Sequence, residues 1–395
     1  MGSQTRFPTQ DGTSTAYQTQ REQTWTKLPR SPVWVLAGPA AIKQVEERYS
    51  PGDNPPHYIP CGEEERMLVD LIGEGIPVVL TGPPGIGKTT LIRSVFWRLG
   101  FPLQTFLATA ATQNHELMGR MGEAGEGGEL ATWRDGRLSL AVRAAYAGLK
   151  NGFYLDEVIK LPPELASTLY SLLDSRGTLS LPTGEEMETR GNLRLVFSYN
   201  PSRTLRLDEA LRSRLTAIRM NYPPPKIEED VLCSPDLGGL ESIKSGREIA
   251  RGLVKFANVI RKAQGYEIHD DLPRLHDRAI ELLRLLGGPP SARTLLVVAK
   301  MVRRGSYSVR EATEFFLIPS LTQDIHDFEM MDLVKLLRRM ADELLPRQPA
   351  TLDLDKLAAM GEEEPEHAPE HDRGTDYSQI ASQVMRQLEM QRKRI

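Results

Sequence analysis

Between residue 62 and about residue 225, short apolar runs alternate with segments of helical periodicity. The apolar runs predict strands at 76–80, 102–108, 152–157 and 193–200. The segments between them predict helices at 88–99, 138–149 and 162–175. Strands separated by helices form a parallel sheet that is covered on both faces, so this part of the chain is expected to be an α/β domain.

Strand-like runs are not found after residue 226, and helical periodicity replaces them. The expected helices are 243–265, 275–286, 291–304, 308–314 and 329–344. The predicted fold class is therefore α/β, a parallel sheet flanked by helices over 33–225, followed by a small all-helical lid domain over 226–345.

The two ends of the chain differ from this middle part. Residues 1–32 are rich in Gln, Thr, Ser and Pro and show no period, which predicts a disordered leader. Pro-rich residues 50–60 predict a connecting loop, and residues 346–376, rich in Pro and Glu, predict a solvated linker. Residues 377–395 predict an amphipathic helix, which is either a docking helix or a short surface helix without a partner.

Composition narrows the class of protein. The chain has 395 residues, of which 40% are hydrophobic, and a formal net charge of −4. This balance argues against a protein held on nucleic acid by bulk charge. No apolar run approaches the roughly 20 residues needed to cross a bilayer, so membrane insertion is not expected. The N-terminus has no apolar signal core, and Cys61 and Cys233 are the only cysteines, which predicts a cytoplasmic protein without a disulfide framework.

The strongest local motif is the run Gly82-Pro83-Pro84-Gly85-Ile86-Gly87-Lys88-Thr89, which fits GxxxxGK[ST]. It follows a predicted strand and opens a predicted helix, and together with Thr90 it forms the expected cofactor-binding segment. Glycines let backbone N–H groups turn toward phosphate oxygens, Lys88 offers an ammonium, and the Thr89 hydroxyl can bind Mg²⁺. The alternative is an ordinary glycine-rich turn between a strand and a helix.

Polar side chains follow two later strands. Asp156 and Glu157 end one of them, where Asp156 would bind Mg²⁺ and Glu157 would polarise an attacking water. Asn200 ends the next strand and would orient that water, because ligands gather at the carboxyl edge of such sheets. The alternatives are solvated acids at a strand end and an Asn-Pro turn.

Three arginines come after these residues in the order expected for groups that stabilise charge on a transferred phosphate. Arg212 and Arg214 lie shortly after Asn200, and Arg293 begins a predicted helix. Since arginine is frequent in this chain, each of them taken alone could be a surface residue.

This series of motifs resembles the AAA+ superfamily, and most closely the MoxR-type ATPases of the CbbQ/NirQ/NorQ branch. The resemblance covers about residues 57–345. Besides the phosphate loop, it rests on the segments LMGRMGEAGEGG, WRDGRLSLAVRAAYAG, FYLDEV, LLDSRGTLSLPTGEE, FSYNP, YPPP and PPSARTLLVVAK.

The resemblance implies a role for each matching residue. Lys88 and Thr89 match Walker A, Asp156 and Glu157 match Walker B, and Asn200 matches sensor 1. Arg214, with Arg212 second, matches the finger that reaches the ATP of a neighbouring protomer, and Arg293 matches sensor 2. The implied cofactors are ATP and Mg²⁺.

The resemblance also implies a job and partners. Such proteins form rings, usually hexamers, and spend ATP to remodel a target metabolic enzyme, commonly with a partner that carries a von Willebrand factor A domain. The DxSxS motif of that domain is absent here, so the partner must be a separate chain. An insert at about 113–135 and a hairpin at about 177–192 are expected to project, and Met118, Met121 and Trp133 would either grip a polypeptide or pack beneath the insert.

Two other functions stay open from the sequence. One is a nucleic-acid motor such as the AAA+ subunit of a restriction system, and the other is a nucleotide-gated scaffold with little turnover. ATP rather than GTP is the default because no NKxD motif occurs, and the resemblance suggests Tyr58 and Ile59 as contacts to the base.

Overall fold

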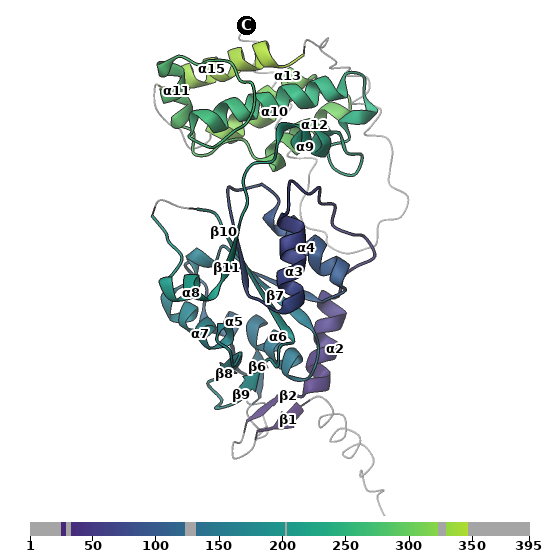
Figure 1. Ribbon diagram of the computed structural model, residues 1–395, viewed down its shortest axis with the longest axis vertical. Coiled ribbons are helices and arrows are strands. Elements are labelled where there is room, and N and C mark those ends of the chain that lie inside the picture. The colour runs from purple at the N-terminus through teal and green to yellow at the C-terminus, as the bar shows by residue number, and fades with distance from the viewer. Residues whose placement is uncertain (1–24, 29–32, 123–131, 202–203, 323–328, 347–395) are drawn as a thin grey trace, which may run out of the picture. The chain divides into compact units, whose positions relative to one another are not determined.

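The computed structural model describes residues 25–28, 33–122, 132–201, 204–322 and 329–346 (Figure 1). The predicted linker, except its first residue, and the predicted tail helix lie outside this part of the chain. Among the described residues, no helix is both long enough and apolar enough to span a bilayer.

A five-stranded sheet with the order β11-β3-β10-β7-β4 forms the α/β region, and all neighbouring strands run parallel. The strands are β3 (Val78–Thr81), β4 (Leu103–Leu107), β7 (Asn151–Asp156), β10 (Leu193–Tyr199) and β11 (Thr216–Arg219). The predicted fold class is confirmed. The sequence analysis predicted four of these strands and did not predict β11.

Successive side chains of a strand point to opposite faces of the sheet, and both faces carry core residues here. On one face, Tyr154 and Val196 pack with α3 (Glu64–Glu74) and α4 (Lys88–Leu99). On the other face, Phe153 and Phe197 pack with α6 (Arg137–Tyr146) and α7 (Pro163–Leu173). The buried strands are apolar on both sides for this reason.

The described residues after β11 contain helices and no strand. These are α9 (Pro225–Cys233), α10 (Gly246–Ala263), α11 (Asp277–Arg284), α12 (Ala292–Arg303), α13 (Val309–Ala312), a π-helical turn (Thr313–Leu317), α14 (Ile318–Thr322) and α15 (Glu329–Leu344), with a 3₁₀ turn at Leu240–Ser242. A separate apolar cluster fills this helical region, with α10 in its middle.

An N-terminal strand pair corrects the predicted leader. β1 (Trp25–Lys27) pairs antiparallel with β2 (Trp34–Leu36), and α2 (Gly38–Tyr49) follows. The prediction of disorder up to residue 32 therefore does not hold for 25–28. The reason is that β1 pairs with β2, and that Leu28 and Val33 pack against the apolar cluster that contains Val35.

Two further hairpins lie where the insert and the hairpin were predicted. The insert contains α5 (Asn114–Leu117), β5 (Gly119–Met121) and β6 (Trp133–Asp135), and the second hairpin consists of β8 (Thr178–Ser180) and β9 (Glu186–Glu188). The insert residues 123–131 lie outside the described part of the chain.

A single buried arginine holds these two hairpins together. Arg143 of α6 donates to both carboxylate oxygens of Asp135, at 2.7 and 3.1 Å, and to both of Glu185, at 2.6 and 2.8 Å. Asp135 ends the insert and Glu185 lies in the turn of the second hairpin. The two hairpins therefore share one ion-pair network as well as one apolar cluster.

The close packing of β7 against α4 gives a stability prediction. A Cβ atom at Gly152 would lie 2.1 Å from the ring of the buried Phe96, so we expect Gly152→Ala to destabilise the fold by about 1–3 kcal/mol. Gly73 is the control, because it lies on an exposed part of α3 with open space around it, and Gly73→Ala should stabilise by about 0.5–1 kcal/mol. Denaturant melts of both variants test this, and equal stability of the two would contradict the packing.

Candidate nucleotide-binding site

The candidate site lies at the carboxyl edge of the sheet, where β3, β7 and β10 end. Residues 82–87 leave β3 and form a loop, and α4 begins at Lys88. Gly85 and Gly87 have φ values of 73° and 97°, which glycine adopts without the penalty that a Cβ atom brings. The loop therefore takes the form that the motif predicts.

Lys88 is buried, and its ammonium lies inside this loop. It donates to the carbonyl oxygens of Gly82 (2.8 Å) and Pro83 (2.9 Å) and to Oδ1 of Asn200 (2.7 Å). Burial lowers the pKa of Lys88 to about 8, and the charges of Glu157 and Asp156 partly oppose this. Three neutral oxygens thus satisfy a desolvated cation, and a phosphate group would be a stronger partner for it.

A chain of hydroxyl groups connects Thr89 with Asp156. The Thr89 hydroxyl lies 3.1 Å from the Tyr154 hydroxyl, which lies 2.9 Å from that of Ser198. Ser198 in turn donates to the Asp156 carboxylate. The two predicted Mg²⁺ ligands are therefore in one network. Tyr154 and Ser198 were not predicted from the sequence, where their only signal is a polar atom in otherwise apolar strands.

Asn200 connects the loop lysine with the predicted general base. Its Oδ1 accepts from Lys88, and its Nδ2 donates to the carboxylate of Glu157. Glu157 has a left-handed backbone with φ of 57°, which costs a non-glycine residue about 1–2 kcal/mol. Lys160 lies 3.7 Å from the same carboxylate. The structure therefore brings Lys88, Asn200 and Glu157 together.

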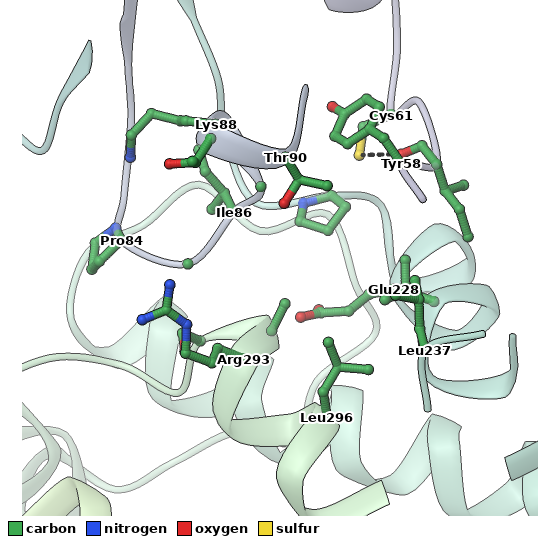
Figure 2. A pocket seen from close by; sticks show the side chains of 18 of the residues that line it. Tyr58, Cys61, Pro84, Ile86, Lys88, Thr90, Glu228, Leu237, Arg293 and Leu296 are labelled. Atoms are coloured by element: carbon green, nitrogen blue, oxygen red, sulfur yellow. Dashed lines mark hydrogen bonds between the residues drawn. The ribbon is translucent and has the colours of Figure 1, made fainter. Parts of the chain in front are cut away.

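A cavity of about 680 Å³ opens in front of these groups (Figure 2). The phosphate loop lines one wall, including Ile86 and Thr90, and Ser291, Arg293 and Leu296 of the helical region line another. The two walls touch, since a Cβ atom at Gly85 would lie 2.4 Å from Cβ of Ser291. The volume suits a nucleotide-sized ligand.

Tyr58, Ile59 and Cys61 contribute uncharged side chains to one part of the cavity. Tyr58 donates its hydroxyl hydrogen to Glu64 at 2.8 Å, and burial raises the pKa of this phenol. Burial also raises the pKa of the Cys61 thiol to about 12, so it stays protonated at neutral pH. Leu237 also lines the cavity. This end fits a flat, uncharged ring such as a base.

Arg293 and the two other predicted arginines differ in position. Arg293 lines the cavity, whereas Arg212 and Arg214 are not among its lining residues. Arg214 donates to Asp174 at 2.6 Å and lies 5.5 Å from the centre of the Tyr170 ring, with a side chain 33% exposed. The Arg212 side chain is 70% exposed and lies 3.7 Å from Glu209, its one salt-bridge partner within the described part of the chain.

The three residues that could contact a polypeptide, Met118, Met121 and Trp133, differ in their burial. Met118 and Trp133 are buried in the cluster beneath the insert, and the Trp133 ring N–H donates to Asp135 at 3.1 Å. Met121 is exposed on β5. Only Met121 is therefore available on the surface.

The donors at this site fit Mg²⁺ held together with a nucleotide. No cluster of three or more His, Cys, Asp or Glu side chains that could hold a metal occurs in the described ranges. Mg²⁺ keeps several waters and takes substrate phosphates with one or two protein oxygens. The Thr89 hydroxyl and the Asp156 carboxylate would supply such protein oxygens.

Comparison with known proteins agrees with this geometry. Residues 77–215 match the family model described as AAA domain (dynein-related subfamily). The chain is 30% identical to "Protein NorQ" of Paracoccus denitrificans over 275 residues, which is 68% of this chain and 88% of that protein. It is 28% identical to "Denitrification regulatory protein NirQ" of Stutzerimonas stutzeri over 68% of this chain and 87% of that protein. It is 30% identical to "Protein CbbQ" of Hydrogenophilus thermoluteolus over 45% of this chain and 65% of that protein.

The match to NorQ extends over most of that protein's length. This extent of identity agrees with the AAA domain match and with a GxxxxGK[ST] loop at the carboxyl edge of a parallel sheet. The chain belongs to the MoxR-type AAA+ ATPases, in the group that contains NorQ, NirQ and CbbQ.

Proposed function

We propose that this protein hydrolyses ATP as a ring-forming ATPase and uses the energy to remodel a target protein complex. The observation that carries the proposal is the position of Asn200, which bonds to both Lys88 and Glu157 and lines a nucleotide-sized cavity. A phosphate-binding cation and a carboxylate base held by one amide form the arrangement that hydrolysis requires.

In the proposed reaction, Glu157 accepts a proton from water as the water oxygen attacks the γ phosphorus. The bond from that phosphorus to the oxygen bridging the β and γ phosphates breaks, and this oxygen leaves on ADP. The Asn200 amide fixes the Glu157 carboxylate, so that the base is oriented before the water arrives. The products are ADP and inorganic phosphate.

Charge stabilisation would come from several groups of this chain. The loop N–H groups and Lys88 would hold the β and γ phosphates from one wall, and Arg293 would reach them from the other (Figure 2). Thr89 and, through water, Asp156 would hold Mg²⁺, which when bound neutralises charge on the phosphate oxygens. Loss of the γ phosphate would remove a shared partner of the two walls and let them separate.

A second protomer would complete the site. We favour Arg214 over Arg212 as the residue acting on the neighbour's ATP, because Asp174 and Tyr170 hold Arg214 in a defined place at the surface. An arginine arriving at the γ phosphate accelerates hydrolysis by about 10³–10⁵. A hexameric ring, as in similar proteins, would place such an arginine at each pocket.

The role in remodelling rests on the family and on the surface hairpins. One relative is named a denitrification regulatory protein, which supports a regulatory role toward an enzyme for this chain as well. The hairpins β5–β6 and β8–β9 present the exposed Met121 and the charged residues Glu186 and Glu188. A separate protein with a von Willebrand factor A domain would act with the ring on the target enzyme.

The test is steady-state ATP hydrolysis with two variants. We expect Glu157→Gln to bind ATP but to hydrolyse it about 10²–10⁴ times more slowly, because it lacks the base. Lys88→Ala should lose ATP binding, since no other loop side chain supplies a cation. Phosphate release and fluorescent-ATP titration measure these two quantities.

A wild-type protein that hydrolyses ATP no faster than Glu157→Gln, with candidate partners present, would contradict the proposal. Tight ATP binding with no turnover would favour a nucleotide-gated scaffold. Hydrolysis stimulated by DNA or RNA in a salt-dependent manner would favour a nucleic-acid motor.

A further prediction concerns Arg214, the arginine that we propose acts between protomers. Arg214→Ala should lower the hydrolysis rate by about 10³-fold or more, whereas Arg212→Ala should stay near the wild-type rate. Mixing inactive Arg214→Ala with inactive Lys88→Ala should restore part of the activity, because each supplies what the other lacks. An inactive mixture, or equal damage from both arginine variants, would argue against Arg214.

A further inference from the structure

The most deeply buried ion pair in the described part of the chain lies beside the cavity. The side chains of Arg261 on α10 and Glu228 on α9 are 0% and 1% exposed. Arg261 donates to both carboxylate oxygens of Glu228, at 2.6 and 2.8 Å. None of the roles argued above uses this pair.

The other bonds of Arg261 lead to the start of α12. Its guanidinium donates twice to the carbonyl oxygen of Pro290, at 2.8 and 3.2 Å, and once to Oδ1 of Asn258 at 2.9 Å. Pro290 directly precedes Ser291, which caps α12 by accepting from the backbone N–H of Thr294. Arg261 therefore fixes the backbone from which α12 begins.

The same guanidinium also contacts the segment that joins the two regions. Its central carbon lies 4.0 Å from the centre of the Tyr222 ring, and Tyr222 lies between the end of β11 and the start of α9. Tyr222 in turn packs edge-on against Tyr266. One buried cation thus contacts the connecting segment, α9 and the backbone before α12.

One of these partners, Glu228, lines the cavity, and another, Pro290, directly precedes residues that line it. Those lining residues include Ser291 and Arg293 (Figure 2). Ser291 is also the residue that lies directly against Gly85 of the phosphate loop. A displacement of Pro290 would therefore move both the contact to the loop and the base of the Arg293 side chain.

Stability alone does not account for such a pair. A buried ion pair is often no more stabilising than well-packed apolar residues of similar volume, because both charges must leave water. Unlike a leucine, Arg261 forms hydrogen bonds of defined direction, because its planar guanidinium group donates to Glu228 on one side and to the Pro290 carbonyl on another. This points to a role in placing the start of α12.

We infer that Arg261, oriented by Glu228, is a positioning residue that holds Ser291 and Arg293 against the phosphate loop and so determines the affinity for ATP. This inference rests on the proposed function, because it requires that the cavity binds ATP. Arg261 acts through the Pro290 carbonyl and does not itself contact the nucleotide.

The test compares Glu228→Gln with Glu185→Gln. Both replace a carboxylate that accepts two hydrogen bonds from a buried arginine, but Glu185 pairs with Arg143 and does not line the cavity. We expect both variants to melt at lower temperature than the wild type. Only Glu228→Gln should weaken ATP binding, by about tenfold, in a fluorescent-ATP titration.

A double-mutant cycle with Arg293→Ala gives a readout that a purely structural role would not move. If Glu228 acts through the placement of Arg293, Arg293→Ala should weaken ATP binding strongly in the wild type and by less than about twofold in Glu228→Gln. Full additivity would overturn the inference, as would wild-type affinity in Glu228→Gln.

Arg261→Lys keeps the test decisive if Glu228→Gln does not fold. It retains a positive charge beside Glu228 but has a single donor nitrogen, so the bonds to Pro290 should be lost and ATP binding should weaken similarly. Unchanged affinity in folded Arg261→Lys would overturn the inference. Failure of the proposed function looks different, since the wild type would then bind no ATP or Lys88→Ala would bind it normally.

Discussion

The parallel register of three strands is the constraint on which the site depends. Tyr199 of β10 is paired with Thr81 of β3, and Phe197 is paired with Leu155 of β7. The next residues along β10 and β7, Ser198 and Asp156, therefore meet at the same level and form a hydrogen bond. If the pairing of β7 with β10 shifted by one residue, Asp156 would point to the opposite face of the sheet and be separated from Thr89.

Buried arginines play a similar part at two distant places in the molecule. Arg143 joins the insert to the β8–β9 hairpin, and Arg261 joins α9 to the backbone before α12. Each holds together segments that are far apart in the sequence. The planar guanidinium group forms charge-assisted hydrogen bonds of defined direction, whereas an apolar contact has no preferred direction. Such bonds therefore fix the orientation of the segments that they join. A buried arginine–carboxylate ion pair therefore stabilises the arrangement of the two hairpins, and a second one stabilises the wall of the cavity.

The sequence predicted the fold class and the helix that begins at Lys88 correctly, because both follow from strong local patterns. It did not predict α2, α3 or β11. β11 has only four residues, three of them exposed, so it shows no apolar run, and it owes its existence to backbone pairing with β3. Tyr154 and Ser198 were missed because their role appears only when two strands lie side by side. The partners of Arg143 and Arg261 could not be predicted either, since Glu185 and Glu228 are 42 and 33 residues away in the chain.

A crystal structure with Mg²⁺ and a non-hydrolysable ATP analogue would show whether Lys88 binds the phosphates of a nucleotide in this cavity. We expect the Lys88 ammonium to leave the carbonyl oxygens of Gly82 and Pro83 and to bond to phosphate oxygens, with Arg293 approaching from the other wall. An analogue bound elsewhere, with Lys88 still bonded to those carbonyls and to Asn200, would contradict it.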